Sequence, residues 1–243
     1  MANSQNIYTA LNHDRKEEIR DKSAKEIIEE NTFFNSSGKT VDKNVKKLND
    51  KNRVLVEERF GDDGKLKARL TFDYEPTGTH SLFRKFERWN NGRYSSETAY
   101  YDYNESWQLV RVTDKTSQGQ VIQVTVLTNN EKGHPVQLQL LDGNGNSYGY
   151  EIAEYDYSKN LFYKEVRSNE GKTLSRDTLT IDYNVQTESS THNEHGDLVK
   201  SEGTIREYKY DDFGNWTMLT IYKLEKGKKK RDRIFKRTIK YKE

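Results

Sequence analysis

Two histidines and a glutamate lie close together in the sequence, in an arrangement that could bind a metal ion. They occur in the segment Thr191-His192-Asn193-Glu194-His195, directly before Gly196. A zinc-protease motif places two histidines four residues apart on one face of a helix. Here the spacing is three, and Asn, Glu and Gly are common turn residues. We therefore interpret the segment as a hairpin turn and predict no metal site there.

The segment Asp142-Gly143-Asn144-Gly145-Asn146 has oxygen-bearing side chains at its first, third and fifth positions. This is the beginning of a calcium loop, which also requires Gly at position 6 and Glu at position 12. The sequence has Ser147 and Ala153 at those positions. We interpret this segment as a hairpin turn and predict no specific calcium site.

Motifs for other catalytic chemistry are absent from the sequence. It contains no Gly-x-Ser-x-Gly elbow, phosphate-binding loop or dinucleotide fingerprint. Adjacent acids such as Glu57 and Glu58 point to opposite faces of a strand. We predict a non-enzymatic protein without a cofactor, and a hydrolase with a cleft between strands is the least favoured alternative.

Three tryptophans, Trp89, Trp107 and Trp216, are the candidate binding residues. Each is expected near a strand end, beside a turn rich in Asn and Asp. An exposed aromatic ring flanked by amide and acid groups suits a sugar ring or a peptide. The alternative, which the sequence favours, is cross-strand packing, because aromatic pairs stabilise a thin sheet.

The elements that position these residues repeat along the chain. Turn clusters contain Gly38, Gly64, Gly92, Gly119, Gly145, Gly171, Gly196 and Gly227, at steps near 27 residues. A second series of turns falls between them, at Asn49, Asp73, Asp102, Asn129, Asp156, Asp182 and Asp211. Two turn series at one period predict two strands in each repeat.

The segments between the turns show the alternation of strands. Ile122, Val124 and Val126 share one face, as do Val136, Leu138 and Leu140. We predict an all-β protein: an antiparallel meander of about eight hairpin repeats, forming one curled or coiling sheet of about 16 strands over residues 26–243. Residues 1–25 are predicted to be an N-terminal arm, with a short helix or a loose segment at 13–24 and strands from about Lys25.

Composition limits the class of protein. Hydrophobic residues make up 32% of the chain, but 16 Tyr, 9 Phe and 3 Trp argue against disorder. Cysteine is absent, so disulfides and thiolate metal sites are excluded. No apolar run approaches the roughly 18 residues of a membrane helix.

The sharpest motif is Tyr210-Asp211-Asp212-Phe213-Gly214-Asn215-Trp216, preceded by Tyr208. It resembles the YD repeat of RHS-type proteins, and the segments starting at Tyr155-Asp156 and Tyr101-Asp102 are similar to degenerate copies. The chain also resembles short YD-repeat-like envelope proteins and lipoproteins of the Bacteroidetes type. The resemblance implies β-hairpins that build a shell or scaffold, with any chemistry in a separate domain.

Charge is unevenly placed along the chain. Residues 223–243 carry 11 Lys and Arg and 3 acidic residues, most densely at 226–233. Nucleic acid or an anionic membrane could bind such a run, but the acidic body disfavours nucleic acid. We predict instead that the last strand, Arg233 to Lys240, is an exposed sheet edge that the basic turn protects.

These observations predict a binding or scaffold module of the bacterial cell envelope, or a secreted one, with a surface glycan or protein as its ligand. An immunity or antitoxin-like protein that covers a toxin in the cytoplasm is the alternative. No transmembrane segment is predicted.

Overall fold

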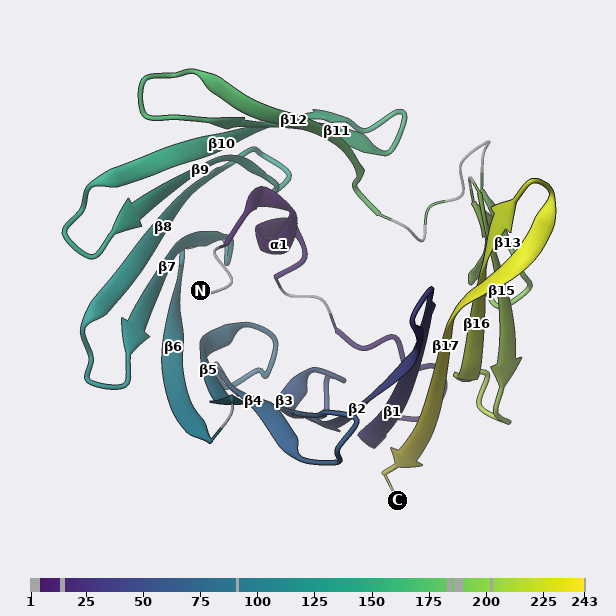
Figure 1. The fold of residues 1–243 in the computed structure, drawn as a ribbon. Coiled ribbons are helices and arrows are strands. Elements are labelled where there is room, and N and C mark those ends of the chain that lie inside the picture. The colour runs from purple at the N-terminus through teal and green to yellow at the C-terminus, as the bar shows by residue number, and fades with distance from the viewer. Residues whose placement is uncertain are drawn as a thin grey trace. The chain divides into compact units, whose positions relative to one another are not determined.

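The computed structural model describes residues 5–13, 16–90, 92–182, 185, 190–201 and 203–242 (Figure 1). They form 17 strands of one sheet and one short helix, and the strand pairs for which a register is described are antiparallel. Consecutive strands pair as hairpins. The predicted all-β antiparallel meander is therefore confirmed.

The chain divides into two compact units. The central unit comprises the described residues within Met1–Arg15, Thr71–Arg88 and Gly92–Ile181. The terminal unit comprises those within Lys16–Leu70, Trp89–Asn91 and Asp182–Glu243. The terminal unit is thus built from both ends of the sequence.

The central unit contains one helix and most of the middle strands. These elements are α1 (Ile7–Leu11), β5 (Ser81–Asn90), β6 (Arg93–Tyr103), β7 (Leu109–Thr116), β8 (Val121–Asn129), β9 (Pro135–Asp142), β10 (Ser147–Asp156), β11 (Leu161–Arg167) and β12 (Thr173–Thr180). Ile7 of α1 is fully buried against a cluster that includes Val112, Leu138 and Phe162. Figure 1 shows α1 lying along one face of these strands. One apolar helical turn therefore completes the core that the sheet face begins.

The terminal unit contains the first and last strands. They are β1 (Ala24–Asn35), β2 (Gly38–Leu48), β3 (Val54–Phe60), β4 (Leu66–Tyr74), β13 (Thr191–His192), β14 (Leu198–Ser201), β15 (Thr204–Tyr210), β16 (Trp216–Glu225) and β17 (Lys228–Tyr241), with the divisions between the units falling inside β4 and near the end of β5. A small core of Ala24, Ile27 and Leu48 is covered by Ile19 and Ile239.

A recurrent turn joins many of the hairpins. In the turn after β8, the Asn130 side-chain oxygen accepts hydrogen bonds from the backbone N–H groups of Lys132 and His134, at 3.0 and 3.1 Å. Gly133 occupies the fourth position with φ of +78°. Asp142, Asn193 and Asp211 begin turns of the same kind. These side chains hold the backbone as an Asx turn, which explains why Asn or Asp begins these turns.

The last strand is not an exposed edge, so that prediction is wrong. β17 pairs with β16 on one side and with β1 on the other, with Ile239 opposite Ile27 and Phe235 opposite Asn31. Figure 1 shows β17 between these two strands. Its backbone groups are therefore used on both sides, and the basic turn before it has no sheet edge to protect.

The N-terminal arm differs from the prediction in its helix. The helix covers Ile7–Leu11, with Asn6 as its N-cap, rather than 13–24. Residues 16–23 are not helical, and β1 begins at Ala24, close to the predicted Lys25. Residues 1–4 and 14–15 of the predicted arm lie outside the described residues. Among the described residues, no helix has the length and hydropathy needed to cross a membrane.

Candidate binding surface

The three candidate tryptophans lie in different surroundings. Trp89 is in β5, with the Arg69 guanidinium 5.8 Å from its ring centroid. Trp107 lies in the turn after β6 and is 49% exposed. Trp216 begins β16, and its ring contacts the guanidinium of Arg237 at 3.7 Å. The contacts described give each ring a different partner.

Trp107 occupies a backbone position that glycine fills in neighbouring turns. Its turn has the Asx geometry, with the Asn104 side-chain oxygen accepting from the N–H groups of Ser106 and Gln108. Trp107 has φ of +57°, whereas Gly133 has +78° at the equivalent place in the turn after β8. A left-handed conformation is a genuine outlier for a bulky residue. Strain of this kind concentrates at functional sites.

The Trp107 ring rests on a rigid support. It stacks on the His80 ring, with centroids 4.9 Å apart and planes 9° apart. Glu75 fixes the turn that carries His80, because its carboxylate accepts hydrogen bonds from the N–H groups of Thr79 and His80. The hydrogen bond from the Thr77 hydroxyl, together with these backbone bonds, holds the pKa of Glu75 down to about 2.

Tyr103 supports the same stack from the side. Its ring centroid is 5.8 Å from that of Trp107, and its hydroxyl donates to the Ser81 carbonyl at 2.9 Å. His13, two residues after α1, contacts the Tyr103 hydroxyl at 2.8 Å. The N-terminal arm is therefore fastened to the base of this stack.

A second aromatic group projects from the turns of the following hairpins. Tyr157 is 38% exposed and carries the Lys132 ammonium 3.6 Å from its ring centroid. Its hydroxyl contacts Asn130 Nδ2 at 2.9 Å and His134 Nδ1 at 3.1 Å. The neighbouring Tyr155 stacks on Tyr157 and donates to the Pro135 carbonyl.

The two aromatic groups belong to successive turns of the central unit. Gln108 lies close to Gly133, since a methyl group built at Gly133 would be 3.2 Å from Gln108 Nε2. We call the combined surface the aromatic rim; it consists of His80, Tyr103, Trp107, Gln108, Asn130, Lys132, His134 and Tyr157. Alternate hairpin turns recur every two strands, or about 9.6 Å. The rim therefore presents aromatic faces and amide groups in a row.

Trp216 has a structural setting. Arg237 covers its ring, and the Arg237 side chain is only 7% exposed. Arg237 donates to Glu17 and Glu29 at 2.9 Å each, and Lys46 contacts the same two carboxylates at 2.8 and 3.2 Å, respectively. Burial raises the pKa of Glu29, but the two cations outweigh it and hold that pKa below its usual value. The cations and the ring thus stabilise the pairing of β1 with β2 and β17.

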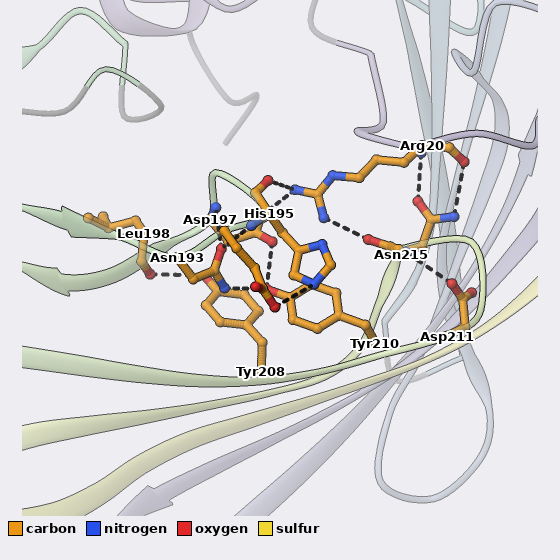
Figure 2. A network of polar contacts seen from close by, with 11 residues as sticks. Arg20, Asn193, His195, Asp197, Leu198, Tyr208, Tyr210, Asp211 and Asn215 are labelled. Carbon is orange, nitrogen blue, oxygen red and sulfur yellow. Dashed lines mark hydrogen bonds and ion pairs between the residues drawn. The ribbon is translucent and has the colours of Figure 1, made fainter.

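A network of polar contacts holds residues 16–23, which we call the strap, against the turns of the terminal unit (Figure 2). Arg20 lies at its centre. Its guanidinium donates to the carbonyls of Gly214 and His195 at 2.7 and 2.8 Å, and pairs with Asp197 at 3.0 Å. Asn215 accepts from the Arg20 N–H and donates to the Arg20 carbonyl.

Tyr210, Asp211 and Asn215, from the sharpest sequence motif, form hydrogen bonds in this network. Tyr210 donates to Asp197 at 2.7 Å and accepts from Asn193 at 2.6 Å. Tyr241 donates to Asp211 and accepts from Asn215. Desolvation by burial raises the pKa of Tyr210, and it raises that of Tyr241 to about 12. These hydroxyls therefore stay protonated and act as structural donors.

The predicted turn segments have local roles. His195 packs against Tyr210, with ring centroids 4.0 Å apart and planes 31° apart, and His192 lies in β13. Among the described residues, no three His, Cys, Asp or Glu side chains are grouped as metal ligands. Asp142 accepts hydrogen bonds from the N–H groups of Asn144 and Asn146, both at 2.8 Å. These bonds and the Asn146 side chain lower the pKa of Asp142.

A buried polar row lies on the apolar face of the central unit. Asp114 of β7, 5% exposed, is directly opposite Gln123 of β8. Burial raises the pKa of Asp114 to about 6, although Arg84 opposes the shift. Gln123 Nε2 and the Thr125 hydroxyl are buried without a hydrogen-bond partner among the described residues. The sequence pattern gave no indication of this row.

Comparison with known proteins relates the chain to others by fold alone. No family model matches it, and no curated protein matches it. A porin-like protein from Bacteroides uniformis aligns over 90% of this chain and 99% of its own, with a TM-score of 0.51 and 11% identity. A porin-like protein from Bacteroides vulgatus (TM-score 0.37, 9% identity) covers 91% and 99%, and a putative outer membrane lipoprotein-sorting protein domain from Vibrio parahaemolyticus (0.18, 8%) covers 71% and 90%.

The resemblance to YD-repeat proteins of the RHS type is therefore wrong. The structural neighbours are porin-like proteins, and no family model supports a YD repeat. The tyrosines near three hairpin ends have a local structural role, since Tyr103, Tyr155 and Tyr208 donate to the carbonyls of Ser81, Pro135 and Leu198. The chain shares its antiparallel β fold with the porin-like protein from Bacteroides uniformis.

Proposed function

We propose that this chain is a non-enzymatic binding module of the bacterial envelope, and that the aromatic rim binds a surface glycan. The observation that carries the proposal is Trp107, a large exposed ring held at a strained left-handed position. Glycine would fit that turn without strain. A contact between the Trp107 ring and a ligand would account for a Trp at this strained position.

The composition of the rim suits carbohydrate. Aromatic faces stack on the apolar face of a sugar ring, while amide and imidazole groups bond its hydroxyls. Gln108 and Asn130 supply amides beside Trp107 and Tyr157, and each ring is fixed by its neighbours. A row of such faces fits an extended chain of sugars better than a single small molecule.

The ionisable groups support a non-enzymatic role. Among the described residues, Asp114 is the carboxyl whose pKa is raised toward neutrality, and it is buried inside the sheet face. The tyrosines of the strap network have raised pKa values, which disfavours their use as bases or nucleophiles. An envelope location is supported by the fold shared with a porin-like Bacteroides protein.

Affinity electrophoresis tests the glycan proposal directly. Native gels containing a linear β-glucan, a xylan or a mannan should retard the parent protein in at least one case. Trp107→Ala and Tyr157→Ala should lose most of that retardation. Tyr148→Ala is the matched control, because Tyr148 is 61% exposed and lies at the opposite end of β10. Retardation that is absent, or equal in all variants, contradicts the proposal.

Cell fractionation tests the location. An antibody to the protein should detect it in the envelope fraction of cells that express the native gene. Recovery in the cytosol alone would contradict the envelope role.

A further inference from the structure

Two hairpin tips in the terminal unit form a cationic pocket that the proposed glycan site does not use. One tip is the turn between β1 and β2, and the other is the turn between β16 and β17. β1 pairs with β17, with Phe33 opposite Arg233, so the two tips lie at the same end of neighbouring strands. A cavity of about 330 Å³ is lined by residues from both tips: Phe34, Asn35, Ser36, Lys223, Glu225, Lys230, Arg231 and Asp232.

The tips carry a large excess of positive charge. Residues 33–40 and 223–233 contain eight Lys and Arg against two acidic residues, which leaves a net charge of +6. Lys230 pairs with Glu225 at 3.1 Å, and Lys223 pairs with Asp232 at 2.7 Å. Both side chains of the Lys230–Glu225 pair are exposed, so water screens this pair and an anion of higher charge can compete for Lys230.

Arg231 is the cation best placed to bind a ligand. It forms no ion pair with a described residue, and its guanidinium lies 5.9 Å from the Phe34 ring centroid. A guanidinium held over an aromatic face keeps its planar edge available for two parallel hydrogen bonds to one phosphate group. Arg231 therefore presents a preoriented donor to the pocket.

The facing turn supplies neutral donors. The Asn35 side-chain oxygen accepts from the N–H and the hydroxyl of Ser37, at 3.0 and 2.8 Å. That orientation leaves Asn35 Nδ2 without a hydrogen bond to a described residue. The Ser36 hydroxyl likewise makes none. One tip thus offers an amide and a hydroxyl, and the other offers a guanidinium.

We propose that this pocket binds a phosphate group through Arg231, Asn35 and Ser36. The group could be free inorganic phosphate or the phosphate of an anionic lipid headgroup, because the same donors recognise both. The surrounding lysines raise the local concentration of either anion and make binding sensitive to salt.

Titration with inorganic phosphate is the first arm of the test. Two-dimensional NMR should show saturable shifts of the Ser36 amide, the Asn35 side-chain amide and the Arg231 Nε–H. Sodium chloride at equal ionic strength should not reproduce them. Arg231→Gln should weaken the apparent affinity at least tenfold. Lys65→Gln is the control, since it removes one positive charge from an exposed turn of the same unit.

Cosedimentation with vesicles is the second arm and distinguishes the two sources. If the protein pellets with phosphatidylglycerol vesicles but not with phosphatidylcholine, and Arg231→Gln reduces this while Lys65→Gln does not, the lipid headgroup is the ligand. If inorganic phosphate causes the NMR shifts but the protein does not pellet with vesicles, the ligand is soluble phosphate. Shifts that chloride reproduces, or that Arg231→Gln leaves unchanged, overturn the proposal. So does vesicle binding without a response to free phosphate, because that indicates general surface charge.

Discussion

The ring of Trp107 lies nearly parallel to the ring of His80, with their planes 9° apart and their centroids 4.9 Å apart. The two residues come from turns on either side of the β5–β6 hairpin. Their stack holds an exposed indole in place although its backbone is strained. The left-handed backbone at Trp107 lowers the stability of the turn, while the same turn presents the indole ring at the surface.

Substitution of Trp107 by Gly and by Ala should separate these effects. Both variants lose the ring, but only Gly adopts φ of +57° without strain. Trp107→Gly should be more stable than Trp107→Ala by about 1 kcal/mol in urea unfolding. The same pair of substitutions at Tyr148, within β10, should give the usual order, with Ala the more stable. Equal stabilities at position 107 would show that the turn relaxes.

The stability of the protein should fall as the pH rises through the range in which Asp114 titrates. Its folded pKa of about 6 exceeds the unfolded value of 3.8, so folding favours the protonated form. This contribution is complete below pH 3.8 and is lost as the pH rises to about 6. The difference corresponds to about 3 kcal/mol.

Asp114→Asn removes that titration and tests the assignment. Its free energy of unfolding relative to the parent should increase by about 2.4 kcal/mol between pH 4 and pH 7.5. Urea unfolding at several pH values measures this. A difference that does not change with pH would show that Asp114 does not titrate in this range.

The strap should depend on Arg20 and Asp197 together. Arg20→Ala also removes bonds to two backbone carbonyls and should cost about 2–4 kcal/mol. A double-mutant cycle with Asp197→Ala should give a coupling energy of about 1–2 kcal/mol. Lys25→Ala, at an exposed position of β1, is the control and should change stability by less than about 0.5 kcal/mol. Additive effects of Arg20 and Asp197 would mean that their ion pair contributes nothing.

Removal of the basic turn should leave the state of association unchanged. If Lys228, Lys229, Lys230 and Arg231 are replaced by Ser, β17 still pairs with β1 and β16, and no strand edge becomes available. The urea midpoint should fall only slightly, because the lost ion pairs to Glu207 and Glu225 are exposed. Light scattering that shows larger assemblies would indicate that the pairing with β1 opens in solution.

The hairpin meander could be predicted because its signals are local. Alternating residues such as Val136 and Leu138, and turn residues such as Asn130 and Gly133, act within a few positions of one another. The predicted number of strands, about 16, differs slightly from the 17 that the described residues form. The step from Gly196 to Gly227 contains three strands, β14, β15 and β16, because the short turn after Ser201 adds a hairpin that the 27-residue period does not contain.

The partners of β17 could not be predicted from local patterns. Its pairing with β1 rests on matches between distant residues, such as Ile239 with Ile27 and Arg237 with Glu29. Either sequence alone is also compatible with an edge strand. The unusual position of Trp107 could have been predicted from the sequence. Trp107 follows Asn104 by three residues, as Gly133 follows Asn130, so it stands where other turns have glycine.

The pairing of β1 with β17 has a consequence for the order of folding during synthesis. Arg237 and Glu29 are 208 residues apart in sequence, so the ribosome must synthesise all of the intervening strands before β1 meets its second neighbour. Until then, β1 and β2 form a hairpin with one edge unsatisfied, which is open to pairing with another nascent chain. The terminal unit should therefore complete its fold only after β17 has been synthesised, later than the strands of the central unit that precede it.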